Sequence, residues 1–137
     1  MKQKKIKPKP AAYEYLLTVS QKYDEVKNKY LTLIRLQTVQ EFTNFKYELA
    51  VEEELEKNKI RYKLLGINTP KLLIPGGGPA VYERTYEKLA GEYEIEVMNL
   101  DGEINFFKIK LLKNKILLFK EQQKSFIDIL CIQKYLK

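Results

Sequence analysis

The sequence contains no histidine and a single cysteine, Cys131, among its 137 residues. Without histidine, the chain lacks the commonest transition-metal ligand and the side chain best suited to proton transfer near neutral pH. A Ser-His-Asp or Cys-His catalytic site is therefore impossible, and one cysteine supports neither an intrachain disulfide nor a cysteine zinc cluster. We expect no cofactor and no metal site, and we favour a non-catalytic protein over an enzyme.

Long apolar runs are also missing from the sequence. Stretches such as "ILLF" and "FIDILCI" are far shorter than the roughly 20 residues that cross a bilayer. Glu14 follows closely on the basic first residues, so the apolar stretch of a signal peptide is missing as well. Together with the single cysteine, this pattern predicts a cytoplasmic protein without a transmembrane segment.

Positive charge is concentrated at the start of the chain, whose formal net charge is +7. Removing the five lysines of "MKQKKIKPKP" from the 25 basic residues leaves 20 against 18 acidic ones. We predict that residues 1–10 form a disordered basic arm, which could bind an anion or nucleic acid by charge alone. Its candidate residues are Lys2, Lys4, Lys5, Lys7 and Lys9. Arginine, whose planar guanidinium suits specific phosphate and base contacts, occurs only three times, so nucleic-acid association is an alternative that we do not favour.

Residues 11–66 have the apolar spacing of a helical segment. Apolar residues recur there at steps of three and four, which places them on one stripe of a helix and resembles a coiled-coil seam. The candidate partner-binding seam consists of Leu16, Val19, Tyr23, Val26, Tyr30 and Leu33. A capping-box spacing begins at Thr38 and a glycine cap lies at Gly66, so one long helix and a helical hairpin both stay open. The seam could bind a partner or pack on the rest of the chain.

Residues 67–79 form a Gly/Pro-rich segment around Gly76, Gly77 and Gly78. A phosphate-binding P-loop needs a lysine and a hydroxyl residue directly after its glycines, whereas Pro79 and Ala80 follow here. Proline also removes a backbone N–H that an anion would use. We therefore interpret the three glycines as a hinge.

Residues 80–137 are predicted to form a small helix followed by a four-stranded antiparallel β-meander. The helix covers residues 79–91, although Val81 and Thr85 also suit a strand. The strands are expected near residues 92–100, 104–112, 115–122 and 125–136. The last two carry apolar residues on both faces, so the second face needs a cover from the upstream helices, from curling of the sheet or from another chain.

The first hairpin of this meander has a register that its charges determine. A three-residue loop, Leu100-Asp101-Gly102, places Tyr93 opposite Ile109 and Ile95 opposite Phe107. It also places Glu92 and Glu94 opposite lysines, whereas a two-residue loop would set charged residues opposite apolar ones. We interpret these glutamates as an ion-pair ladder. The acidic stretch at residues 52–56 is interpreted as a solvated helix face.

These observations predict an α+β fold, with a long N-terminal helix or helical hairpin followed by the meander. We expect a non-catalytic protein-interaction or assembly module, which binds another protein or a second copy of itself. One alternative is a weak, charge-driven nucleic-acid-associated protein. The other is a small-ligand-binding domain with a tyrosine-lined pocket, or an enzyme that uses Lys, Glu or Tyr for acid-base chemistry.

Overall fold

The computed structural model describes residues 13–68, 75–87, 89–112, 115–121 and 126–133. Within these ranges the fold is all-β, with nine strands and no helix. The strands are β1 Tyr15–Asp24, β2 Lys29–Phe42, β3 Glu48–Glu56, β4 Lys59–Asn68, β5 Gly78–Tyr86, β6 Gly91–Met98, β7 Ile104–Leu112, β8 Lys115–Glu121 and β9 Ile127–Gln133.

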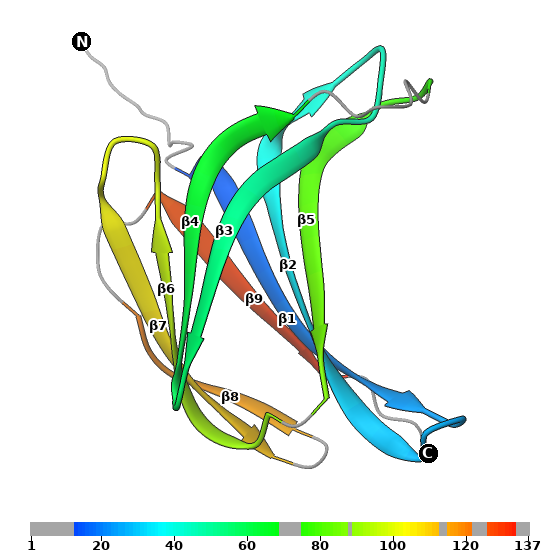
Figure 1. The fold of residues 1–137 in the computed structure, drawn as a ribbon, viewed down its shortest axis with the longest axis vertical. Helices are drawn as coiled ribbons and strands as arrows, with labels where there is room; N and C mark the ends of the chain where they lie inside the picture. Colours follow the sequence, from blue (N-terminus) through cyan, green and yellow to red (C-terminus); the bar gives the residue numbers. More distant parts are fainter. Residues whose placement is uncertain (1–12, 69–74, 88, 113–114, 122–125, 134–137) are drawn as a thin grey trace, which may run out of the picture.

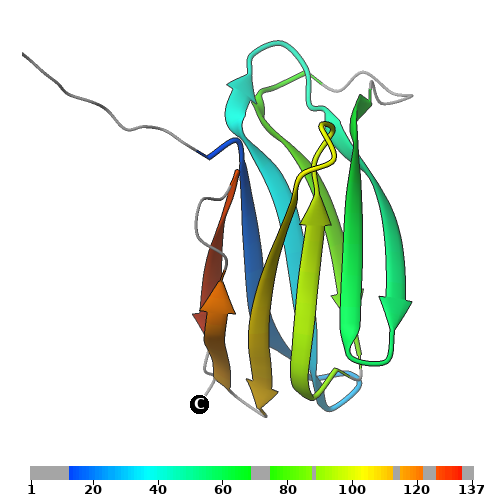
Figure 2. The same ribbon diagram turned by 90° about the vertical axis from the view of Figure 1, so that its left-hand side faces the viewer.

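All nine strands belong to one sheet, in the order β8-β7-β6-β4-β3-β5-β2-β1-β9. The sheet curls into a nearly closed, barrel-like shape (Figures 1 and 2). Most neighbours are antiparallel, but β1 pairs with β9, β4 with β6 and β3 with β5 in parallel. The interior of this curled sheet forms the core.

Strands form here because apolar residues alternate with polar ones, and alternate residues of a strand point to opposite faces. In β2, for example, Ile34 and Leu36 are buried between the outward-facing Leu33, Arg35 and Gln37. Each fully buried aliphatic side chain contributes about 1.5–3 kcal/mol relative to an exposed one. The largest side chains of the core that are almost fully buried are Leu17, Val19, Ile34, Leu36, Ile60, Tyr62, Leu64, Ile95, Phe107, Ile109, Leu111 and Ile127.

The prediction of an α+β fold with a helical segment at residues 11–66 is wrong. The described part of this segment forms β1 to β4. The chain reverses direction after Asp24, whose carboxylate accepts a hydrogen bond from the backbone N–H of Val26 at 3.0 Å, and Asn28 takes a left-handed conformation with φ of 57°. Because asparagine adopts this conformation more readily than most residues, the turn needs neither glycine nor proline.

The prediction of a small helix after the glycine run is also wrong. Gly78–Tyr86 form β5, which pairs with β2. The four-stranded meander is only partly correct. Strands β6, β7 and β8 are consecutive antiparallel neighbours, but β9 leaves them and pairs in parallel with β1 at the other edge of the sheet. Curling of the sheet buries Ile116 and Ile127 in the interior, whereas Leu118, Phe119 and Leu130 stay exposed.

The register predicted for the β6–β7 hairpin is confirmed. Tyr93 lies opposite Ile109 and Ile95 opposite Phe107, with Glu92 and Glu94 opposite Lys110 and Lys108. In the loop, the backbone N–H of Asn99 donates to the carbonyl of Glu103, and Gly102 has a positive φ of 85°. Glycine adopts this conformation without the steric cost that a side chain would add.

Candidate functional site

Strands β3 and β5 are neighbours in the sheet, yet a single residue pair, Glu48 with Val81, joins their described backbones. Beyond this pair the two strands diverge toward their C-terminal ends (Figure 1). The edges of β3 and β5 that face away from each other are paired, since β3 pairs with β4 and β5 pairs with β2. Residues 50–56 of β3 and 82–86 of β5 therefore have no described ladder partner on the sides that face each other. We call this opening the β3–β5 split.

Inward-pointing polar side chains connect the two strands beneath the split. The Glu53 carboxylate on β3 lies 3.0 Å from Arg84 Nη1 on β5, and it accepts a hydrogen bond from the Tyr86 hydroxyl. The Tyr86 oxygen in turn lies 2.7 Å from the hydroxyl of Tyr62 on β4. Since the Tyr86 proton is directed to Glu53, Tyr62 donates to Tyr86. We call these four residues, Glu53, Tyr62, Arg84 and Tyr86, the polar floor.

The polar floor is buried at one end and open at the other. Tyr62 and Tyr86 are 1% and 6% exposed, whereas the Arg84 side chain is 47% exposed. Burial raises the pKa of both tyrosines well above that of an exposed tyrosine, and the hydrogen bond to Glu53 raises the pKa of Tyr86 further. Both hydroxyls therefore stay protonated at neutral pH and act as hydrogen-bond donors. The Arg84 guanidinium lies 5.5 Å from the centre of the Tyr86 ring, where its charge faces the negative ring surface.

Strand β3, which borders the split, is strongly acidic. β3 contains five glutamates and no basic residue. On its outer face, Arg61 of β4 contacts Glu54 at 3.2 Å and Glu56 at 3.6 Å, and it also reaches Glu96 of β6 at 3.1 Å. An open groove of about 520 Å³ runs along this face. Glu52 is exposed in the same groove, opposite Lys63.

This arrangement is suited to holding an extended backbone. Two facing strand edges offer N–H and C=O groups, and an added strand could pair with both.

The polar floor contains one carboxylate, and that carboxylate is already bound to Arg84 and Tyr86. In the part of the chain that the structure covers, no three Cys, Asp or Glu residues are placed to hold a metal ion.

The residues of the predicted partner-binding seam do not share one stripe. Val19 is buried in the interior, Leu16 and Leu33 lie on the outer face, and Val26 is 93% exposed in the β1–β2 turn. Tyr23 and Tyr30 do meet, as an edge-to-face ring pair 5.0 Å apart at the end of the β1–β2 hairpin. The prediction of a helical seam is therefore wrong. The six residues lie on two strands and the turn between them, and they face different sides of the sheet.

Gly76 and Gly77 precede β5 and Gly78 begins it, beside Phe42 at the end of β2 and residues 43–45 of the β2–β3 connection. The backbone N–H of Gly76 donates to the carbonyl of Asn44 at 3.2 Å. A Cβ atom on Gly77 would lie 2.7 Å from the carbonyl oxygen of Phe42, so this position requires glycine for close backbone approach. The hinge stays a prediction, because residues 69–74 lie outside the described ranges. The basic arm, with Lys2, Lys4, Lys5, Lys7 and Lys9, also lies outside them.

The polar floor was not recognised from the sequence. The sequence pattern predicts Glu53 on a solvated helix face and the residues around Tyr86 in a short helix at residues 79–91. In a strand, Glu53 points inward while Glu52 and Glu54 point outward, and this separates it from its neighbours. A period of two through Val51, Glu53 and Leu55 was the available signal, but three consecutive glutamates conceal it.

Comparison of the chain with known protein families, with curated proteins and with solved structures found no match. The described residues contain no helix that could serve as a membrane span.

Proposed function

We propose that this chain is a non-catalytic protein-interaction module, which takes up an extended, basic segment of a partner protein as a guest strand in the β3–β5 split. The observation that carries the proposal is the divergence of β3 from β5 after a single residue pair. It leaves two strand edges facing one opening, and strand addition to such edges is a common way to bind peptides. A cytoplasmic location stays part of the proposal, because one cysteine cannot form an intrachain disulfide.

The charge of β3 favours a basic partner. Its five glutamates would repel a second β3 strand placed beside it, because like charges directly opposite each other destabilise a strand pair. Lysine or arginine at the outward positions of a guest strand would instead lie near Glu52 and Glu54. Residues 1–10 of this chain have suitable chemistry, with five lysines and no acid, so the source of the guest strand can be a second copy.

The polar floor favours a guest strand with polar residues at its inward positions. Arg84 is nearly half exposed above the buried Ile34, its neighbour in the β2–β5 register. A guest side chain that accepts a hydrogen bond could contact this guanidinium, whereas an apolar side chain would cover it without a partner. The partner motif that we infer therefore alternates basic and small polar residues.

The proposal is tested with a short labelled peptide of alternating lysine and threonine, titrated in physiological salt. We expect a Kd of about 10–100 µM, with NMR shift changes along residues 50–56 and 82–86. A peptide in which glutamate replaces each lysine is the control for charge. Equal binding of both peptides, or shift changes that avoid β3 and β5, would contradict the proposal.

A pair of variants separates local charge from total charge. Glu52→Lys, at the split, should weaken binding about fivefold. Asp101→Lys changes the net charge by the same amount in the exposed β6–β7 loop and should leave the affinity nearly unchanged. Deletion of residues 1–10 then identifies the source of the guest strand, because loss of an oligomer on deletion would show that the arm of a second copy occupies the split.

A further inference from the structure

A second cavity lies at the end of the curled sheet where β1 turns into β2, and one of its lining residues, Thr32, pairs with Tyr86 of the polar floor across β2 and β5. It has a volume of about 630 Å³, opens to solvent, and is lined by side chains of β1, β2 and β7 together with Leu89 and Ala90. This volume is within the range of about 300–1,000 Å³ that small-molecule sites occupy.

Gln21 of β1 is the distinctive residue of this cavity. It is 4% exposed, and its side-chain N–H donates to the backbone carbonyl of Leu112 at 2.7 Å. That bond fixes the orientation of the amide, so the carbonyl oxygen Oε1 is the free end. Oε1 is buried and has no hydrogen-bond partner among the described residues. A buried acceptor without a donor is costly, and buried polar groups are paired in most folded proteins.

The surroundings of Gln21 are mainly aromatic and aliphatic. Tyr23 and Tyr30 form their edge-to-face pair on one side, and the buried Leu111 lies on the other. The Tyr23 hydroxyl is already used, because it donates to the side-chain oxygen of Asn28. Flat rings pack well against such an aromatic pair.

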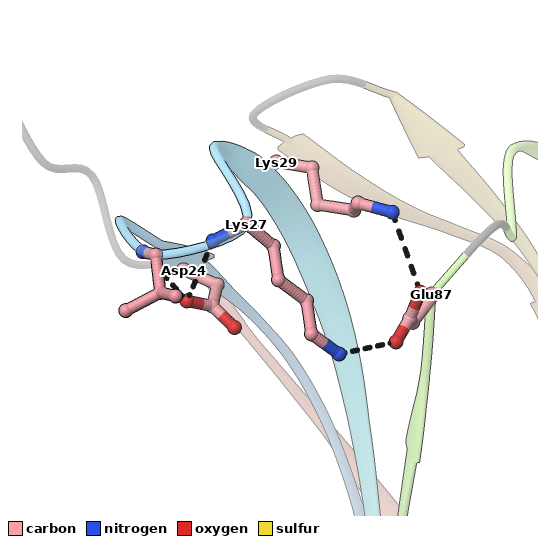
Figure 3. A network of polar contacts seen from close by, with 5 residues as sticks. Asp24, Lys27, Lys29 and Glu87 are labelled. Atoms are coloured by element: carbon pink, nitrogen blue, oxygen red, sulfur yellow. Dashed lines mark hydrogen bonds and ion pairs between the residues drawn. The ribbon is translucent and has the colours of Figure 1, made fainter.

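The charges at the rim are paired with one another. Glu87, just after β5, contacts Lys27 at 2.5 Å and Lys29 at 3.3 Å, which connects the β1–β2 turn to the segment that leads to Leu89 (Figure 3). The hydrogen bond between Lys27 and Glu87 raises the pKa of Lys27 and lowers the pKa of Glu87. Because Lys29 lines the cavity while it contacts Glu87, the rim gives no strong preference for a charged ligand.

We propose that this cavity is a binding site for an uncharged, planar small molecule that carries an N–H or O–H donor, which it directs to Gln21 Oε1. Because Oε1 is buried, the ligand displaces the side chains that cover this atom as it binds. The cavity shares no lining residue with the β3–β5 split, although Thr32 of the cavity neighbours Tyr86. Its specificity comes from the donor, because a molecule of the same shape without one would leave Oε1 unpaired.

Indole and 1-methylindole form the test pair, because they share a ring system and only indole has an N–H donor. We expect saturable binding of indole with a Kd of about 1 mM, as befits so small a ligand, and binding of 1-methylindole that is at least about fivefold weaker. NMR shift changes should include the side-chain amide of Gln21. Equal affinity for the two compounds, absence of indole binding, or shift changes confined to other regions would each overturn the proposal.

Variants then connect the preference to Gln21. Gln21→Met keeps the length of the side chain but removes the acceptor, so it should abolish the discrimination between indole and 1-methylindole. Gln37→Met, on β2 with its side chain on the outer face, is the control and should retain it. Persistent discrimination in a folded Gln21→Met protein would overturn the assignment. If that variant does not fold, the comparison of the two compounds on the unmodified chain still decides the question.

Discussion

Strands β3 and β6 are both rich in glutamate, but one borders an opening and the other is closed on both sides. β6 lies between β4 and β7, with which it pairs, and its inward residues Ile95 and Val97 are fully buried. β3 pairs along one edge, and its inward residues include Glu53 and Leu55, the latter 52% exposed. The inward positions, rather than the outward glutamates that both strands share, therefore distinguish a strand paired on both edges from a strand that borders an opening.

The largest expected effect comes from truncating equivalent inward positions of the two strands. Ile95→Ala should lower the free energy of unfolding by about 2–5 kcal/mol, because it leaves a cavity in the core. Leu55→Ala should cost less than about 1 kcal/mol, because the side chain is half exposed. Urea denaturation measures both values. Similar losses for the two variants would contradict the distinction between the strands.

Removal of the Glu53 carboxylate should have the next largest effect. Glu53→Leu leaves the Tyr86 hydroxyl without its acceptor and Arg84 without its ion pair, and we expect a loss of about 1–3 kcal/mol in unfolding free energy. Glu53→Gln keeps an acceptor of the same shape and should lose less. A Glu53→Leu protein more stable than the unmodified chain would show that the polar floor does not hold the two strands together.

Alkaline pH should weaken the β3–β5 side through its tyrosines. The pKa values of Tyr62 and Tyr86 in the folded state lie above the value of 10.0 that they have when exposed, so the unfolded chain releases their protons first. Their contribution to stability is therefore complete below about pH 10 and is lost as the pH rises above that value. Urea denaturation at increasing pH should show a decline that is shallower in Tyr86→Phe. Identical slopes would contradict the burial that the structure assigns to Tyr86.

The smallest effect is expected from the outward charges of β6. Reversal of Glu94 to lysine opposite Lys108 should cost about 0.2–1 kcal/mol, and the additional change Lys108→Glu should recover part of it, because Lys59 of β4 still lies opposite position 94 on the other side. A double-mutant cycle of unfolding free energies measures this coupling. A coupling well above this range would mean that outward charges contribute strongly to the pairing of β6, and would contradict the assignment of that role to the inward residues.

The β6–β7 hairpin could be predicted from the sequence because two local signals agree there. An Asp-Gly loop and glutamates that match lysines across the strands select one register. In residues 13–42 the signals conflict. Steps of three and four through Leu16, Val19 and Tyr23 fit a helix, whereas the inward set Leu17, Val19 and Gln21 has the period of a strand. The turn at Asn28 contains neither glycine nor proline, so no local break reveals the hairpin.

The β3–β4 hairpin was mispredicted for a different reason. Its residues are mostly Glu, Lys and Leu, which have high helix propensity, but pairing with β6 on one side and burial of Ile60, Tyr62 and Leu64 override that preference. The split itself depends on how two strands far apart in the sequence diverge. That geometry leaves no local pattern, and neither does the unpaired oxygen of Gln21, which depends on where the carbonyl of Leu112 lies.

Amide hydrogen exchange, measured residue by residue on the unmodified chain, tests the open β3–β5 split most directly. We predict that alternate amides of residues 50–56 and 82–86, those that point into the split, exchange rapidly, while their neighbours in the β3–β4 and β2–β5 ladders are protected. Residues 94–98 of β6 should be protected without this alternation, because both edges are paired. Uniform protection of β3 and β5, equal to that of β6, would show that β3 and β5 pair along their length and would contradict an open β3–β5 split.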